Sequence, residues 1–80
     1  MIPKLKKGQR YKTRGGWTAI CIWVNANDLK EGGFCIHEPC SKVESCPLRH
    51  WGDGSAHATF SINEAPYYDG HPADLMEELK

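Results

Sequence analysis

The residues that could do chemistry are gathered in one short stretch. Three of the four cysteines and two of the four histidines lie between residues 35 and 50, namely Cys35, His37, Cys40, Cys46 and His50. Thiolates and imidazoles bind zinc, and neighbouring cysteines can instead close a disulfide. A third alternative is that the thiols are free and pack as small apolar groups.

A zinc site would use Cys35, Cys40, Cys46 and His50 as its ligands. Structural zinc sites usually have two closely spaced ligand pairs, because a tight turn must aim both ligands at one tetrahedral centre. Only the Cys46-x3-His50 spacing is of this kind, whereas Cys35-x4-Cys40 and Cys40-x5-Cys46 are loose. We therefore expect no cofactor, with zinc, or a Cys40 to Cys46 disulfide, as the alternatives.

The sequence does not predict an enzyme. His37 and Glu38 precede Cys40, but neighbouring residues of a strand point to opposite faces and would not act on one substrate atom. The chain has no Gly-x-Ser-x-Gly, His-Glu-x-x-His or phosphate-binding glycine motif. A chain of 80 residues would also struggle to enclose a water-excluding pocket.

The large aromatic side chains are better candidates for a binding surface. Tryptophan and tyrosine are enriched in binding hot spots, and this chain has more of them than a small core can bury fully. They could equally complete a thin core. The candidate partner-binding residues are Trp17, Trp23, Trp51, Tyr67 and Tyr68.

Charge is balanced over the whole chain but not along it. The net charge is zero, yet residues 1–14 carry six cations and no anion, and residues 64–80 carry five anions and only Lys80 as a cation. Pairing of the two ends, within one chain or between two, is the simplest expectation. Nucleic-acid binding is not favoured, because a neutral chain lacks the field that attracts phosphates.

Neither a signal peptide nor a membrane span is expected. No stretch approaches the roughly 20 apolar residues that a span requires, and no long apolar run follows the basic N-terminus. We expect one cytoplasmic domain over residues 1–80, with reduced thiols.

The elements that position these residues are predicted to be short strands. Polar and apolar residues alternate from residue 9 to residue 62, and Gly, Asp and Pro separate the segments. We predict strands over residues 10–14, 17–24, 34–37, 48–51 and 56–62. The last nine residues form a short helix or a closing strand.

Five such strands predict a mainly β fold, either a small antiparallel SH3-like barrel or a bent sheet. Residues 17–24 are apolar on both faces, so something beyond a simple core must cover one face. The candidates are the C-terminal segment and a second subunit. The predicted core is Tyr11, Ile20, Ile22, Val24, Phe34, Ile36, Leu48, Phe60 and Ile62.

Three motifs follow one another along the chain. They are a Tyr-x-Thr-Arg-x-Gly opening at residues 11–16, Trp-x-Asp-Gly at 51–54 and His-Pro-x-Asp-Leu at 71–75. This set resembles short β-rich proteins encoded in phages and prophages. The resemblance implies a small β-rich protein of phage or bacterial origin. That group has no assigned biochemical role, so no functional residue is transferred, and the Cys-rich segment 35–46 is not part of the pattern.

These observations predict a non-enzymatic binding or interaction module. Its partner would be a second copy of the chain, a host protein or a small ligand, bound through the aromatic face. The alternative is a zinc-stapled nucleic-acid adaptor. Its phosphate contacts would come from Lys4, Lys6, Lys7, Arg10, Lys12 and Arg14.

Overall fold

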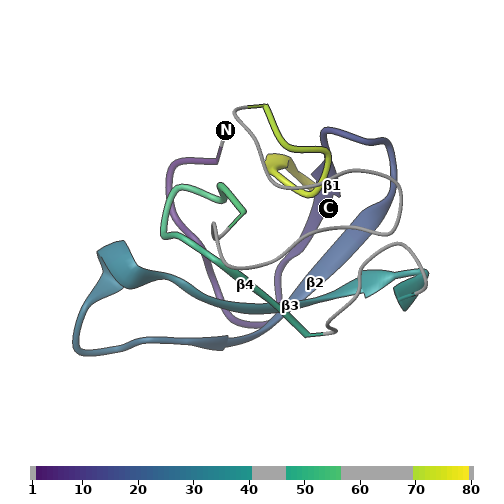
Figure 1. Cartoon of the computed structure of the whole chain (residues 1–80). Coiled ribbons are helices and arrows are strands. Elements are labelled where there is room, and N and C mark those ends of the chain that lie inside the picture. Colours follow the sequence, from purple (N-terminus) through teal and green to yellow (C-terminus); the bar gives the residue numbers. More distant parts are fainter. Residues whose placement is uncertain (1, 41–46, 57–69, 80) are drawn as a thin grey trace.

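The chain folds into one strongly bent antiparallel sheet (Figure 1). The structure, a computed structural model, describes residues 2–40, 47–56 and 70–79. In these residues the elements are β1 (Arg10–Thr13), β2 (Thr18–Val24), the 3-10 turn η1 (Leu29–Glu31), β3 (Gly33–Glu38), β4 (Leu48–His50) and β5 (Leu75–Leu79). The strand order is β4-β3-β2-β1-β5, and each strand is antiparallel to its neighbours.

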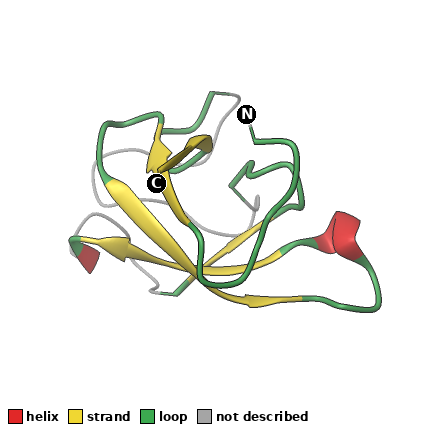
Figure 2. Ribbon diagram, turned by 180° about the vertical axis from the view of Figure 1, so that it is seen from behind, coloured by secondary structure: helices red, strands yellow, loops and turns green. Residues whose placement is uncertain are grey.

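The prediction of a mainly β fold with a bent sheet is confirmed. Figure 2 shows the sheet curling into a half-barrel, with almost no helix. The C-terminal segment is the closing strand rather than a helix, since β5 pairs with β1. Of the strand predicted at 56–62, Ala56 forms a bridge with His50, and residues 57–62 lie outside the described residues. No helix in the described ranges is long and apolar enough to cross a membrane.

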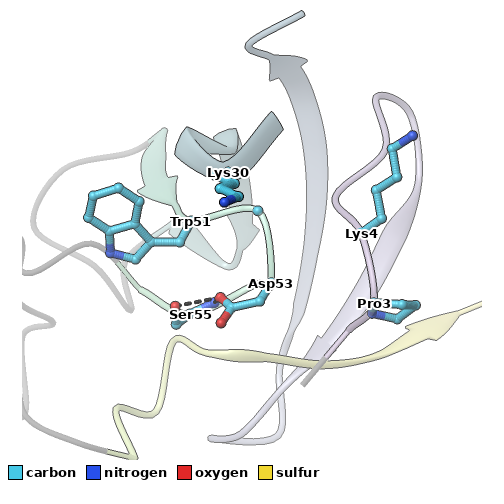
Figure 3. A pocket seen from close by; sticks show the side chains of 7 residues that line it. Pro3, Lys4, Lys30, Trp51, Asp53 and Ser55 are labelled. Carbon is cyan, nitrogen blue, oxygen red and sulfur yellow. Dashed lines mark hydrogen bonds between the residues drawn. The ribbon is translucent and has the colours of Figure 1, made fainter. Parts of the chain in front are cut away.

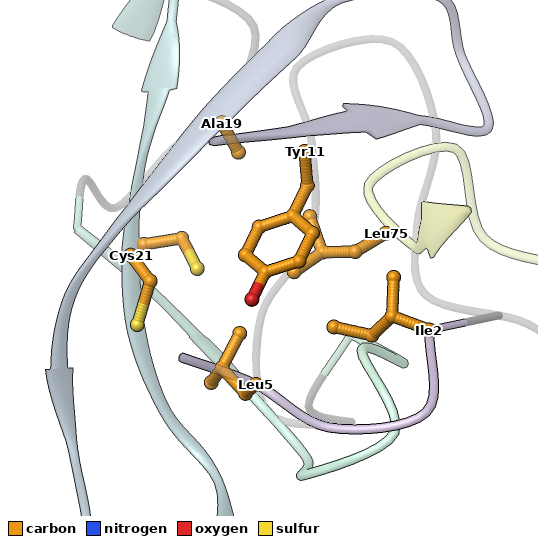
Figure 4. Close-up of a cluster of buried hydrophobic side chains, with 7 residues drawn as sticks. Ile2, Leu5, Tyr11, Ala19, Cys21 and Leu75 are labelled. Atoms are coloured by element: carbon orange, nitrogen blue, oxygen red, sulfur yellow. The ribbon is translucent and has the colours of Figure 1, made fainter. Parts of the chain in front are cut away.

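The core lies on the concave side of the sheet and is built around one large ring (Figure 4). Tyr11 is fully buried, and its hydroxyl accepts a hydrogen bond of 2.8 Å from the Lys6 amide. The small side chains that line β2 and β3 leave room for this ring, and the N-terminal segment covers it. The cluster consists of Ile2, Leu5, Tyr11, Ala19, Cys21, Cys35 and Leu75.

The prediction of which faces of β2 and β3 are buried was wrong. Tyr11 and Leu48 are buried and Val24 packs against the core, as expected. Phe60 and Ile62 lie outside the described residues. The alternate residues of β2 and β3 point inward instead of those predicted, and the exposed or half-buried ones are Ile20, Ile22, Phe34 and Ile36. Alternation does not identify the inner face when a strand is apolar on both faces.

The two oppositely charged ends of the chain pair with each other within one molecule. This is one of the two arrangements that the charge distribution predicts. Lys12 lies opposite Glu77 in the β1–β5 register, and the Lys6 ammonium is 3.3 Å from the Glu78 carboxylate. These exposed pairs contribute little to stability. They nevertheless neutralise part of the basic segment.

A buried carboxylate makes the firmest of these connections. Asp74 is only 4% exposed, and its Oδ2 lies 3.4 Å from the Arg14 guanidinium. Its Oδ1 accepts a hydrogen bond of 2.8 Å from the amide of Ala56. The Arg and Asp of the first and third sequence motifs therefore hold distant segments together, which is a structural role.

Gly54 is the residue at which the second and third motifs meet. Its carbonyl oxygen accepts hydrogen bonds from the Leu75 amide, at 2.9 Å, and from His50 Nδ1, at 3.1 Å. Its φ is +91°, and a Cβ atom there would lie 2.8 Å from Ile2 Cγ1 and 3.0 Å from Leu75. Only glycine fits both the backbone conformation and the space.

We expect Gly54→Ala to destabilise the fold more than Gly16→Ala does. Gly16 has nearly the same φ, +94°, but a Cβ atom there meets nothing within 4 Å. Gly16→Ala should therefore cost only the left-handed strain, about 1 kcal/mol. Gly54→Ala should cost about 1–3 kcal/mol more through overpacking. Urea unfolding of both variants measures the difference, and equal losses would contradict the packing argument.

Candidate functional site

A chain of hydrogen bonds runs through the buried polar part of the fold. Trp17 Nε1 donates to His37 Nδ1 at 2.6 Å, and His37 Nε2 lies 2.9 Å from His50 Nε2. The rings of His37 and His50 are stacked and both residues are fully buried. His50 Nδ1 then reaches the carbonyl oxygen of Gly54. The histidine pair thus connects Trp17, the residue just before β2, with β3, β4 and the turn after β4.

These contacts determine which nitrogen of each ring holds the proton. Indole Nε1 can only donate, so His37 Nδ1 accepts and the proton of the neutral ring is on Nε2. His37 Nε2 therefore donates to His50, whose own proton must be on Nδ1, where it is donated to Gly54. Every link of the chain is satisfied only when both imidazoles are neutral.

Protonation of either ring would place two N–H groups against each other in a buried site. Burial, together with the neighbouring histidines, lowers the pKa of His37 to about 3. Burial lowers the pKa of His50 to about 4, although the hydrogen bond to Gly54 raises this pKa in part. The pair is a neutral structural network, and neither ring is accessible to act as a base on a substrate.

The residues predicted to bind zinc are not brought together in the described part of the chain. Cys35 packs in the core opposite Cys21, His50 has both ring nitrogens engaged, and Cys40 is exposed just after β3. No group of three or more potential ligands occurs among the described residues. Cys46 lies outside them, so the complete zinc set and the Cys40 to Cys46 disulfide stay predictions.

The tryptophans predicted to bind a partner differ in their exposure and contacts. Trp17 is hydrogen-bonded to His37. Trp23 is 49% exposed on the outer face of β2, and Trp51 is 37% exposed after β4. Tyr67 and Tyr68 lie outside the described residues. The role of these residues in binding a partner stays a prediction, and the surroundings of Trp23 and of Trp51 are described in turn.

Trp23 belongs to an apolar surface that the sequence reasoning assigned to the core. We define the outer apolar strip as Ile20, Ile22, Trp23, Phe34 and Ile36, on the convex face of β2 and β3. Ile20 pairs with Ile36 across the strands, and Trp23 pairs with Phe34 at a ring distance of 5.8 Å. The signal in the sequence was the apolar character of both faces of residues 17–24.

A β-bulge brings Trp23 onto this strip. Cys21 pairs with Cys35 and Trp23 pairs with Phe34, so Ile22 has no partner in the register. The extra residue changes the phase of alternation, which places Trp23 on the outer face and Val24 against the core. The thiol of Cys21 donates to the carbonyl oxygen of Trp23 at 3.5 Å and bridges the bulge.

The strip is bordered by charges of both signs. Arg10 lies opposite Ile20, Arg49 opposite Phe34, and Glu38 opposite Thr18. A second anion stands near one of these cations, since the Glu31 carboxylate is 3.9 Å from the Arg49 guanidinium. An apolar centre with a mixed charged border is the usual anatomy of a protein interface.

Trp51 lines a different feature, an open groove of about 630 Å³ (Figure 3). The groove lies between the N-terminal segment, η1 and the turn that follows β4. Its lining residues are Pro3, Lys4, Lys30, Trp51, Gly52, Asp53 and Ser55. Among them, only Trp51 and Lys4 were candidate binding residues in the sequence analysis.

Comparison with protein-family models, with curated proteins and with solved structures found no match. Functional conclusions therefore depend on the strip, the groove and the buried network themselves.

The neutral histidine pair predicts that stability falls in mild acid. The unfolded chain takes up protons below about pH 6.5, whereas folded His37 and His50 stay neutral until about pH 3 and 4. The stabilisation is therefore complete above pH 6.5 and is lost as the pH falls. Between pH 7 and pH 5 we expect a loss of about 2 kcal/mol for each of these histidines.

His37→Gln is the matched variant for this measurement. A glutamine amide can accept from Trp17 and donate to His50, but it does not titrate. In urea unfolding at pH 7, 6 and 5, the variant should lose less stability between pH 7 and pH 5 than the wild type, by about 2 kcal/mol. Equal losses in both proteins would show that His37 is not the titrating group.

The buried thiols should be protected from alkylation in the folded protein. Cys21 and Cys35 are 1% and 0% exposed, and the adjacent Cys21 thiol together with burial raises the pKa of Cys35. Iodoacetamide should modify both at least about 100-fold more slowly in buffer than in 6 M urea, because burial blocks access to both thiols and the raised pKa of Cys35 also disfavours its reactive thiolate. Rapid native labelling of Cys35, located by peptide mapping, would contradict its placement in the core.

Proposed function

We propose that this protein is a non-enzymatic interaction module that pairs with a second copy of itself through the outer apolar strip. The observation that supports this is the exposure of Trp23 at 49% and of Ile22 at 38%, side by side on a sheet face. Contiguous apolar patches rimmed by polar residues mark interaction sites in soluble proteins.

The border of the strip favours an identical partner. In a twofold dimer the same surface meets itself, so a border that carries both signs can pair cations with anions. A strongly basic or acidic partner would meet charges of its own sign at this border. The border charges are Arg10, Lys12, Arg49, Glu31, Glu38 and Glu77.

The zinc-stapled nucleic-acid adaptor has less support. Two of its ligands, Cys35 and His50, are engaged in the core, and Lys6 and Arg14 pair with acidic side chains of the C-terminal segment. The phage or bacterial origin and the cytoplasmic location remain predictions that accompany the proposal. A host protein remains a second predicted partner for the same strip.

Trp23→Ala should weaken self-association. Truncation of a central interface tryptophan costs about 2 kcal/mol or more, which corresponds to roughly a 30-fold weaker dimer. Sedimentation velocity at about 10–200 µM protein should show a dimer that dissociates on dilution for the wild type, and mostly monomer for the variant.

Lys30→Ala is the control, because Lys30 is exposed and lies on the groove but outside the strip. Its sedimentation profile should match that of the wild type. A monomeric wild type at the highest concentration, or a dimer that survives Trp23→Ala with the fold intact by circular dichroism, would exclude association through the strip.

A further inference from the structure

The groove beside Trp51 has walls that are fixed by the backbone. The Gly52 amide donates to the Lys30 carbonyl at 3.1 Å, and the Gly52 carbonyl accepts from the Leu5 amide at 3.0 Å. Gly52 therefore connects the turn after β4 to η1 on one side and to the N-terminal segment on the other. A groove that is formed before the ligand arrives avoids the cost of ordering its walls.

The turn itself is also held rigidly. The Trp51 amide donates to the Ser55 carbonyl at 2.9 Å, and the Gly54 amide donates to the Trp51 carbonyl at 2.9 Å. The Asp53 carboxylate accepts from both the amide, at 2.9 Å, and the hydroxyl, at 2.6 Å, of Ser55. These hydrogen bonds fix the positions of Trp51, Asp53 and Ser55 beside the groove.

Three kinds of chemistry follow one another across the groove (Figure 3). The Trp51 ring stands at one end, where the Arg49 guanidinium lies 5.9 Å from its centre. The Asp53 carboxylate lies in the middle. Lys30 stands across from Asp53, and Lys4 lies at the other end, and neither lysine forms an ion pair with another described residue.

We infer that this groove binds a nucleoside phosphate, with the base on Trp51, the ribose at Asp53 and the phosphate between Lys4 and Lys30. Aromatic rings bind bases by stacking, whatever the base. Carboxylates accept hydrogen bonds from ribose hydroxyls, and lysine binds phosphate as a point charge. The groove volume of about 630 Å³ lies within the range of small-molecule sites.

The position of Asp53 sets the direction of the ligand. Its hydrogen bonds from Ser55 lower the pKa of the carboxyl group, so it stays an anion that accepts and does not donate. A phosphate placed near Asp53 would be repelled, whereas a hydroxyl would be bound. The anionic end of the ligand is therefore directed to the lysines.

The test is calorimetric titration of the full chain with AMP at about 50 mM salt, where charge screening is moderate. We expect saturable binding that is at least fivefold weaker in Lys4→Ala and in Lys30→Ala, and weaker in Trp51→Leu. Lys7→Ala is the matched control, since Lys7 is exposed but does not line the groove. It should change the affinity less than twofold.

Three further probes separate the parts of the proposal. Adenosine and inorganic phosphate should each bind at least tenfold more weakly than AMP, because each lacks one half of the contacts. Inorganic phosphate as tight as AMP would reduce the site to an anion site and overturn the inference. An oligonucleotide of ten residues that binds far more tightly than AMP would also overturn it, in favour of single-stranded nucleic acid.

Failure of AMP to bind at millimolar concentration, or binding unaffected by both lysine substitutions, would likewise exclude the site. Trp23→Ala should leave AMP binding within twofold of the wild type, because Trp23 does not line the groove. The proposal for the groove and the proposal for the self-association surface are therefore tested independently.

Discussion

The carbonyl oxygen of Gly54 is the point on which the rest of the fold depends. It accepts from Leu75 and from His50, and through His50 it ends the hydrogen-bond chain that begins at Trp17. The closing strand, the turn after β4 and the histidine pair are all positioned by one peptide group. Both histidine rings of this chain are fully buried, so an alternative arrangement would leave at least one buried polar group unsatisfied, at about 1–3 kcal/mol. The network therefore selects one packing of the sheet rather than adding much net stability.

The sequence predicted the strands better than it predicted their faces. Alternation and turn residues located β1, β2, β3 and β4 to within a residue or two, because these signals are local. The inward face of β2 depends on a non-local fact: the Tyr11 ring occupies the space above Ala19 and Cys21, where isoleucine would not fit. The bulge at Ile22 then reverses the alternation, so the phase of the first half of β2 does not apply to Trp23.

The Cys and His cluster between residues 35 and 50 shows the same limit. Because these residues are close in sequence, a common site was plausible. The geometry of the strands instead places their side chains in different parts of the fold. Cys35 packs against Cys21, and Cys40 is exposed at the end of β3. His37 and His50 do meet, yet through hydrogen bonds to each other rather than through a metal, in a contact between residues 13 apart. The tautomers that satisfy this pair follow from Trp17 and Gly54, neither of which belongs to the cluster.

Arg49 is the residue at which the two candidate surfaces meet. On β4 it stands opposite Phe34 at the border of the outer apolar strip, while its guanidinium lies over the Trp51 ring and near Glu31. Substitution of Arg49 would therefore disturb the strip and the groove together and would not separate their functions. Trp23 and Lys30 do separate them, because each lies on one surface only.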